Sequence, residues 1–421
     1  MARTTTLASI GLLGLTSLSF FACGPSRDAN GPRAGDSNAI AKMTVSALEV
    51  EATRPATEAL DAWEKVLKEA RETRGTPLAR EAGLAAIDAI SGREVVGLES
   101  LGDEVGLAAR VVDGERKAAA ILDETLASDG TRDPMLHAAA SAARMKLAAA
   151  KGDAKGFAAA VEASGCATEA TIVGPFVGPS LGALSDPGPV DSGALVAGYA
   201  PPKTASAPSL ALSTKPTSTS GRSCSLDITG TSSGGGLRYV VVDVDVAEAQ
   251  TISVGLETKL PAQLLVGGRP AVSVSYGEIA TTVIRFGHVE VKDAGTVRLV
   301  VKLGAYSPDA VVVYALAEDG TRLVSHAAAV GAAPSTPIGR VEMEKPMAPP
   351  ASVEGRVTLA LGLLAAGEAK RAEWVIAEVA HPVNASAKTK PPAAAALVWA
   401  RTLRFARDLP EFRRLERFRA A

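Results

Sequence analysis

LRYVVVDVDVAEAQTISVGLE, residues 237–257, is the stretch that decides the fold of the middle of the chain. Apolar and polar residues alternate over Leu237–Val246 and Thr251–Glu257, and many of the apolar positions hold valine or isoleucine. Alternation with a period of two and β-branched side chains are typical of strands that bury one face. The pattern therefore predicts two β-strands here.

The β pattern continues on both sides of this stretch. Turn signals such as Gly267-Gly268 and Asp319-Gly320 separate further short runs. Residues 177–223 are crowded with Pro, Gly, Ser and Thr and are predicted to form a long loop. We therefore expect an antiparallel β-sandwich over residues 167–341. The additional strands are predicted at Thr171–Phe176, Cys224–Ile228, Ala262–Val266, Ala280–Val291, Thr296–Leu303 and Ala310–Ala317.

Both flanks of the β-rich region have helical periodicity. Leu60, Trp63, Leu67 and Ala70 recur at intervals of three and four residues, which places them on one helix face. Asp133 before Pro134 is a good pair for the start of a helix. The fold class is therefore predicted to be multidomain α and β, with helices over 43–165 as a solenoid or a bundle, and helical hairpins over 353–421.

Several segments carry a resemblance to known envelope proteins. ISVGLETKLPAQLLVGGRPAV, VEVKDAGTVRLVVKLG and VVVYALAEDGTRL, in this order, resemble a galactose-binding-type jelly roll. The helical flanks loosely resemble tetratricopeptide-type repeats. Together they resemble bacterial, myxobacterial-type envelope lipoproteins, in which helical repeats accompany such a jelly roll. Leu265 stands where an exposed Trp is common in the jelly rolls, so the resemblance implies a fold more than a ligand.

The N-terminus has the organisation of an export signal. Arg3 precedes an apolar run from Leu7 to Phe21, and Phe20-Phe21-Ala22-Cys23-Gly24 resembles a bacterial lipobox. The resemblance implies a signal peptide over 1–22 and an acylated (palmitate-type) Cys23 as the first mature residue. An uncleaved anchor or an ordinary secretory signal remains open. Residues 23–42 are mostly small and polar and are predicted to be a flexible tether.

With Cys23 assigned to lipid, Cys166 and Cys224 remain as a pair. An oxidising compartment would allow them to form a disulfide around the loop-rich segment, while two buried thiols are the alternative. Neither CxxC nor Cys/His spacing occurs, so the sequence predicts no metal site.

Two motifs invite a catalytic interpretation. Ser180 lies in a G-x-S-x-G pattern, but the residues after it cannot form the helix that a nucleophile elbow needs. His137, His288, His326 and His381 are scattered and have no partner at ligand or triad spacing. We therefore predict no catalytic residue, no cofactor and no enzyme.

Two further groups of side chains could either be exposed to solvent without a specific role or bind a ligand or partner. Asp243 and Asp245 should share one strand face, either as a solvated outer face, which we favour, or as part of a cation site. Seven arginines from Arg401 onward suit a solvated helix face, which we favour, or a contact with anionic lipid or an acidic partner. Trp63, Trp374 and Trp399 are expected to pack in the core or at its rim. The arginines are Arg401, Arg404, Arg407, Arg413, Arg414, Arg417 and Arg419.

A formal net charge of −2 provides no basic field, which argues against nucleic acid as a partner. The hypothesis that best fits the sequence is a lipid-anchored, non-enzymatic protein-interaction scaffold that binds an envelope protein. The expected location is the outer membrane, facing the periplasm or the surface. The alternative is a carbohydrate-binding module that recognises envelope glycan.

Overall fold

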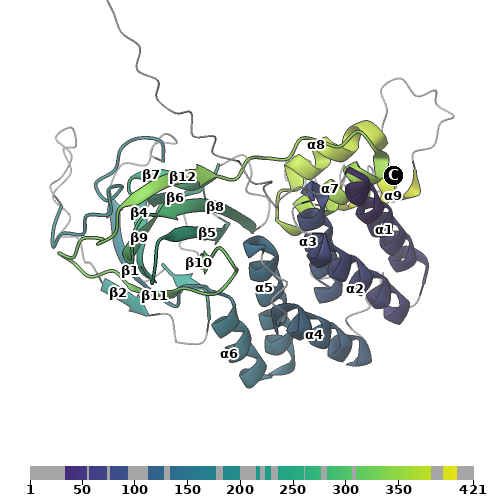
Figure 1. Cartoon of the computed structure of the whole chain (residues 1–421), viewed down its shortest axis with the longest axis horizontal. Coiled ribbons are helices and arrows are strands. Elements are labelled where there is room, and N and C mark those ends of the chain that lie inside the picture. The colour runs from purple at the N-terminus through teal and green to yellow at the C-terminus, as the bar shows by residue number, and fades with distance from the viewer. Residues whose placement is uncertain are drawn as a thin grey trace, which may run out of the picture.

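The fold is taken from a computed structural model, in which helices stand at both ends of the chain and strands in the middle (Figure 1). Within the described residues, the chain forms nine helices and two antiparallel sheets. The predicted combination of helical flanks and a β-rich middle is confirmed at this level. The residues described are 34–54, 56–73, 76–92, 112–127, 133–176, 184–199, 215–218, 223–228, 236–259, 261–275, 282–305, 310–380 and 392–404.

Two sheets pack face to face in the middle of the chain. Sheet 1 has the order β2 (Lys215–Ser218), β1 (Glu169–Phe176), β4 (Gly236–Val246), β9 (Gly295–Ala305), β6 (Ala262–Val266), β7 (Arg269–Val274), and β11 (Val324–Ala327) also pairs with β4. Sheet 2 has the order β12 (Ile338–Met343), β8 (Val283–Val291), β5 (Gln250–Thr258), β10 (Ala310–Ala317), β3 (Leu226–Asp227). The strand predictions made from alternation are confirmed, whereas β2, β7, β11 and β12 were not predicted as strands.

The alternation of β4 decides which residues enter the core. Val240, Val242 and Val244 point inward and pack against residues of sheet 2 such as Val254 and Val313. Tyr239 and Val241 point to the other face of sheet 1, where they are also buried. Sheet 1 is therefore covered on both faces.

The segment predicted as a long loop, 177–223, contributes both a cover on the outer face of sheet 1 and one strand, β2, which the loop prediction missed. Residues 184–199 pack on this face through Leu184, Val190 and Leu195, and β2 adds an edge strand beside β1. Proline-rich and glycine-rich sequence has no alternation of apolar and polar residues, so neither the packing of 184–199 on the sheet nor the strand β2 could be predicted from it. The residues between these segments lie outside the described part of the chain.

The helices from the two ends of the chain pack together as one layer, with α1–α3 in purple beside α7–α9 in yellow-green (Figure 1). Helix α7 contacts both α1 and α3, and α9 contacts α1 and α8. The helices that the sequence predicted as two regions, 43–165 and 353–421, therefore share one packed layer. The helices are α1 (Ala34–Thr53), α2 (Ala56–Glu72), α3 (Pro77–Ser91), α4 (Val112–Ala127), α5 (Pro134–Lys151), α6 (Ala154–Ala163), α7 (Val353–Ala365), α8 (Ala369–Ala380) and α9 (Ala393–Arg404).

Polar contacts between distant parts of the chain accompany this packing. Glu51 on α1 accepts a hydrogen bond from the Trp63 indole at 2.9 Å and pairs with Arg401 of α9 at 2.7 Å. The interpretation of Arg401 as part of a solvated face is therefore wrong. The side chain of Arg404 and residues 405–421, with the remaining arginines, lie outside the described part.

The tether prediction also needs correction, because residues 34–42 belong to α1. Ile40 and Ala41 are buried in the helical core. Their small and polar neighbours suggested a flexible segment, but packing against the other helices overrides this local composition. Residues 23–33 lie outside the described part.

The helical layer rests on the outer face of sheet 2. Ile284, Phe286, Tyr314 and Leu316 project from the sheet into the same apolar cluster as the helices. Phe286 lies over Gly255 on the neighbouring strand, where a Cβ atom would come within 2.5 Å of the ring. Because Gly255 has no side chain, the Phe286 ring can lie over this residue and still contact the helices.

Helices α3 and α7 approach closely at Gly362. A Cβ atom there would lie 2.6 Å from Cα of Glu81, which is backbone and cannot move aside as a side chain end can. We expect Gly362→Ala to destabilise the fold by about 1–3 kcal/mol, although alanine is the better helix former. Chemical unfolding measures the difference.

The control for this prediction is Gly198→Ala, because a Cβ atom at Gly198 would meet nothing within 4 Å. Its stability should remain within about 0.5 kcal/mol of the wild type, as for most surface substitutions. Equal stability of Gly362→Ala and the wild type would contradict the close α3–α7 contact.

Candidate functional site

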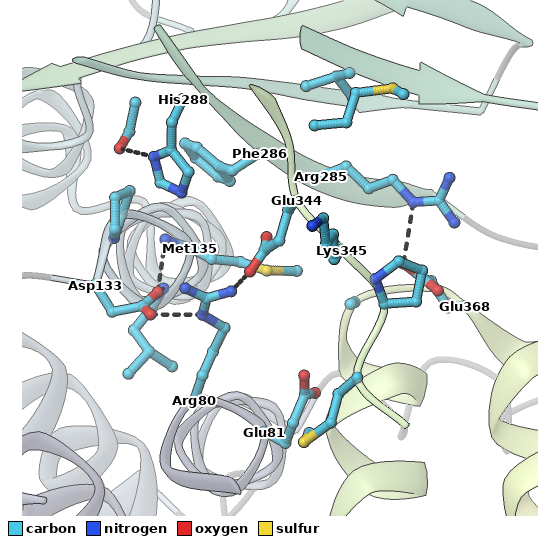
Figure 2. A pocket seen from close by; sticks show the side chains of 18 of the residues that line it. Arg80, Glu81, Asp133, Met135, Arg285, Phe286, His288, Glu344, Lys345 and Glu368 are labelled. Atoms are coloured by element: carbon cyan, nitrogen blue, oxygen red, sulfur yellow. Dashed lines mark hydrogen bonds and ion pairs between the residues drawn. The ribbon is translucent and has the colours of Figure 1, made fainter. Parts of the chain in front are cut away.

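A cleft of about 880 Å³ lies where the helical layer meets the sandwich (Figure 2). Its walls come from α3, the start of α5, strands β5, β7 and β8, and the beginning of α8. The connection from β12 to α7 contributes residues 343–347 to the lining. Segments far apart in the sequence, from Ala70 to Arg371, therefore form one concave surface.

The sheet side of the cleft carries small hydroxyl groups beside one aromatic ring. Thr251, Ser253 and Ser273 line it together with Phe286 and His288. Ser253 lies on β5 directly opposite His288 on β8, and its Oγ is 3.2 Å from His288 Nδ1. This wall can exchange hydrogen bonds with a polar ligand.

The first of two ion-pair groups in the cleft is centred on Arg80 of α3. Its Nε lies 2.5 Å from Oδ2 of Asp133, and its Nη1 pairs with Oε1 of Glu344 on the β12–α7 connection (Figure 2). Asp133 also caps α5, because its Oδ1 accepts hydrogen bonds from the amides of Met135 and Leu136 at 3.0 and 3.1 Å. The predicted start of this helix is thereby confirmed.

The second ion-pair group is centred on Glu368, just before α8. Arg285 of β8 approaches one of its oxygens at 3.0 Å, and Arg371 approaches the other at 2.6 Å. Arg285 also donates to the backbone oxygen of Ser273 on β7 at 2.7 Å. Arg285 therefore links both sheets to the helical layer.

Glu81 of α3 is the exceptional carboxyl group in the cleft. Burial raises its pKa to about 7, and the repulsion from Glu368 and Asp133 adds to the increase against the attraction of Arg80 and Arg371. Within the described part of the chain, its carboxyl group makes no hydrogen bond or ion pair. Its side chain points into the cleft from below (Figure 2).

The ionisable groups of the lining balance each other. Five basic residues face five acidic residues, so the surface is rich in hydrogen-bonding groups but has no net formal charge. Burial and the nearby Arg80 lower the pKa of His288, so this ring is neutral at pH 7. The two sets are Arg71, Arg80, Arg285, Lys345 and Arg371, and Glu81, Asp133, Glu318, Glu344 and Glu368.

The predicted cysteine pair forms a disulfide in the structure, with the Cα atoms 5.5 Å apart. Cys166 follows α6 and Cys224 precedes β3, so the bond fastens the end of the first helical segment to the sandwich. Ser164 Oγ lies 3.3 Å from Cys224 Sγ. A crosslink over 58 residues of chain stabilises by about 3–4 kcal/mol in the chain-entropy view.

The three histidines in the described part of the chain are not brought together by the fold. His137 on α5 is buried, with Nε2 2.6 Å from the backbone oxygen of Ala163, and burial lowers its pKa. His326 on β11 lies 3.8 Å from Asp245, far in sequence from His288 in the cleft. Cys23, Ser180 and His381 lie outside the described part. Within that part, no group of three or more His, Cys, Asp or Glu side chains is arranged to hold a metal ion.

The expectation of a solvated face at Asp243 is wrong. Asp243 is buried beside Arg298, whose guanidinium donates to both of its carboxylate oxygens at 2.7 Å. Arg298 also donates to the backbone oxygens of Gly193 and Ala332, which belong to the segments covering sheet 1. The neighbouring Asp245 is half exposed and accepts a hydrogen bond from Thr296, as a solvated position would.

The tryptophans divide between core and surface. Trp63 and Trp399 are buried in the helical core, as expected, whereas Trp374 on α8 is 63% exposed. The Arg80 and Glu368 groups of the cleft were missed from sequence, because the pairs Arg80–Asp133 and Arg285–Glu368 each join residues more than 50 positions apart. The only legible signal was Asp133 at the start of its helix.

Comparisons with protein-family profiles, with curated proteins and with solved structures find no match to this chain. None of the helices in the described residues has both the length and the apolar character needed to cross a bilayer.

The raised pKa of Glu81 makes a prediction about stability. Its folded pKa of about 7 exceeds the usual value of 4.5, so the stability that neutral Glu81 contributes is complete below pH 4.5 and is lost as pH rises through 7. We expect Glu81→Gln to be more stable than the wild type at pH 8.5 by up to about 3 kcal/mol, and nearly equal at pH 5. Urea unfolding at both pH values measures this.

The control is Glu378→Gln, which changes an exposed carboxyl group that pairs with Arg356 on the surface. It should change stability by less than about 1 kcal/mol at both pH values. A Glu81→Gln variant less stable than the wild type at pH 8.5 would contradict the burial of this carboxyl group.

Proposed function

We propose that the protein is a lipid-anchored, non-enzymatic protein of the cell envelope, and that the cleft binds an uncharged, hydroxyl-rich ligand such as an envelope glycan. The observation that carries the proposal is the balanced lining of the cleft. Its guanidinium and carboxylate groups are oriented by mutual ion pairs, so they offer hydrogen bonds in fixed directions without a net field.

The size and chemistry of the cleft support this ligand class. A volume of about 880 Å³ is within the range of sites that enclose a small ligand. Hydroxyl groups of a sugar can both donate to carboxylates and accept from guanidinium groups. Phe286 and the methionines in the lining provide an apolar surface for the C–H face of a ring.

We further propose that the sandwich is a jelly roll of the galactose-binding type and that the helices form a tetratricopeptide-like solenoid. The two antiparallel sheets around one core support the first part. The successive helix hairpins α2–α3 and α7–α8, packed side by side, support the second.

A second candidate function is the protein-interaction scaffold that the sequence suggested. The observation that favours it is Trp374, because exposed tryptophans are enriched at the centres of protein interfaces. Co-purification of one defined envelope protein that is lost with Trp374→Ala, and retained with a blocked cleft, would favour the scaffold over the glycan hypothesis.

Blocking the cleft tests the main proposal. Ser275 is an exposed residue of the lining, and Ser275→Trp places an indole in the opening without burying it in the core. In a glycan array and in sedimentation with purified peptidoglycan, we expect the wild type to bind and the variant to bind at least about tenfold more weakly, since the ring excludes the ligand.

The matched control is Ala333→Trp, which adds the same ring on an exposed residue of the segment that packs against sheet 1. This variant should bind as the wild type does. Equal binding by Ser275→Trp and the wild type, or the absence of binding by the wild type, would contradict the proposal.

Anchoring at Cys23 is tested separately. Because acylation needs the thiol, Cys23→Ser should leave the protein as an unprocessed precursor or release it from the membrane fraction. Mass spectrometry of the wild-type N-terminus should show an acylated cysteine. A mature chain that starts elsewhere would contradict the lipid anchor.

A further inference from the structure

The carboxyl and guanidinium groups at the base of the cleft are unequal in number. Four carboxyl groups, of Glu81, Asp133, Glu344 and Glu368, share the three guanidinium groups of Arg80, Arg285 and Arg371. Three of these carboxylates are paired with an arginine, and the fourth, Glu81, makes no such pair in the described part of the chain. These seven groups, which leave out Arg71, Glu318 and Lys345 of the wider lining, sum to zero charge only while Glu81 keeps its proton.

The other ionisable groups facing the cluster do not supply the missing charge. Arg71 and Glu318 are of opposite sign and cancel formally, and His288 is neutral at pH 7 because burial lowers its pKa. Lys345 is exposed at the mouth of the cleft, where water screens its charge. A proton on Glu81 is therefore the group that balances the base of the cleft.

The three paired carboxylates are held with different strength. Asp133 caps α5 through two backbone amides, and Glu368 is buried between two arginines. Glu344 has one partner, Arg80, and lies between the exposed residues Met343 and Lys345. If ionised Glu81 competes for Arg80, we expect Glu344 to lose its ion pair, because it is the most weakly held of the three.

Glu344 begins the connection from β12 to α7, residues 344–352, which we call the strap. Its first residues line the cleft, and Figure 2 shows Glu344 and Lys345 crossing the view above Glu81. We propose that the strap closes the cleft through the Glu344–Arg80 ion pair, and that ionisation of Glu81 releases it. As the regulation of the proposed binding site, this inference rests on the proposed function, but the movement of the strap is measurable without any ligand.

The surroundings of Glu81 favour Arg80 as its partner when the carboxyl group is ionised, in place of Glu344. Helix α7 approaches α3 at Gly362, where a Cβ atom would come 2.3 Å from Glu81 Oε2, so the backbone of α7 limits where the carboxyl group can turn. When Glu81 is ionised, the cations within its influence are Arg80 and Arg371, and Arg371 is held by the buried Glu368. The released strap would open the cleft as pH rises through about 7.

The test is a distance measurement between spin labels on the full chain. Lys345→Cys places one label on the strap, and Lys68→Cys places the other on the exposed face of α2, in a Cys23→Ser background that leaves the native disulfide unlabelled. We expect one narrow distance distribution at pH 6, and a longer, broader one at pH 8.5 with a midpoint near pH 7.

Three variants complete the test. Glu81→Gln should keep the narrow distribution at both pH values, and Glu344→Gln should show the broad one at both. Glu342→Gln changes an exposed carboxyl group of β12 that pairs with Arg340, and should behave as the wild type. If Glu81→Gln fails to fold, Glu81→Ala removes the same group and carries the same expectation.

Distances that do not change with pH in the wild type would overturn the proposal, as would a pH-dependent change that persists in Glu81→Gln. Because no ligand is present, a failure here leaves the glycan proposal standing. Conversely, failure of the glycan test leaves the strap measurement valid.

Discussion

The packing of α7 against α3 and α1 is the contact on which the rest of the structure depends. It joins helices from the two ends of the chain, and it places the sandwich between them in sequence but beside them in space (Figure 1). The shared apolar core includes Leu48, Ile87 and Leu359, all fully buried. Since no pair of these helices buries its face alone, loss of α7 would expose the face of α3 as well.

This arrangement also creates the cleft and the ionic groups that line it. Once the helices and sheet 2 are fixed in position, Arg80 meets Asp133 and Arg285 meets Glu368, although neither pair belongs to a local motif. The half-buried Glu81 lies at the close α3–α7 contact, and its carboxyl group has no hydrogen-bond or ion-pair partner in the described part of the chain. A second buried ion pair, Arg298 with Asp243, holds the covering segments on sheet 1 in the same way.

The helices and strands whose boundaries depend on local sequence pattern could be predicted. The strands β6 and β10 were predicted at their observed boundaries, because alternation and glycine turns delimit them. The start of α5 followed from Asp133 and Pro134. The assignment of 34–42 to a tether failed because the burial of Ile40 depends on helices elsewhere in the chain.

The candidate site could not be predicted from the sequence, because its contacts also join residues that are far apart in the chain. In the cleft, the ion pair of Arg285 with Glu368 joins residues 83 positions apart, and no local periodicity encodes it. Asp243 alternates with valines as a solvated residue would, yet it is covered by a segment whose sequence indicated only loop. Local composition was sufficient to predict helices and strands, whereas the pairing of polar groups depended on tertiary contacts.

Native-state hydrogen exchange of the full chain tests the central claim most directly. If the two ends of the chain form one layer, buried amides of α3 and α7 should open together, with the same free energy and the same dependence on denaturant. Exchange of α7 at low free energy while α3 remains protected would show that the C-terminal helices are a separate unit, and would contradict the account.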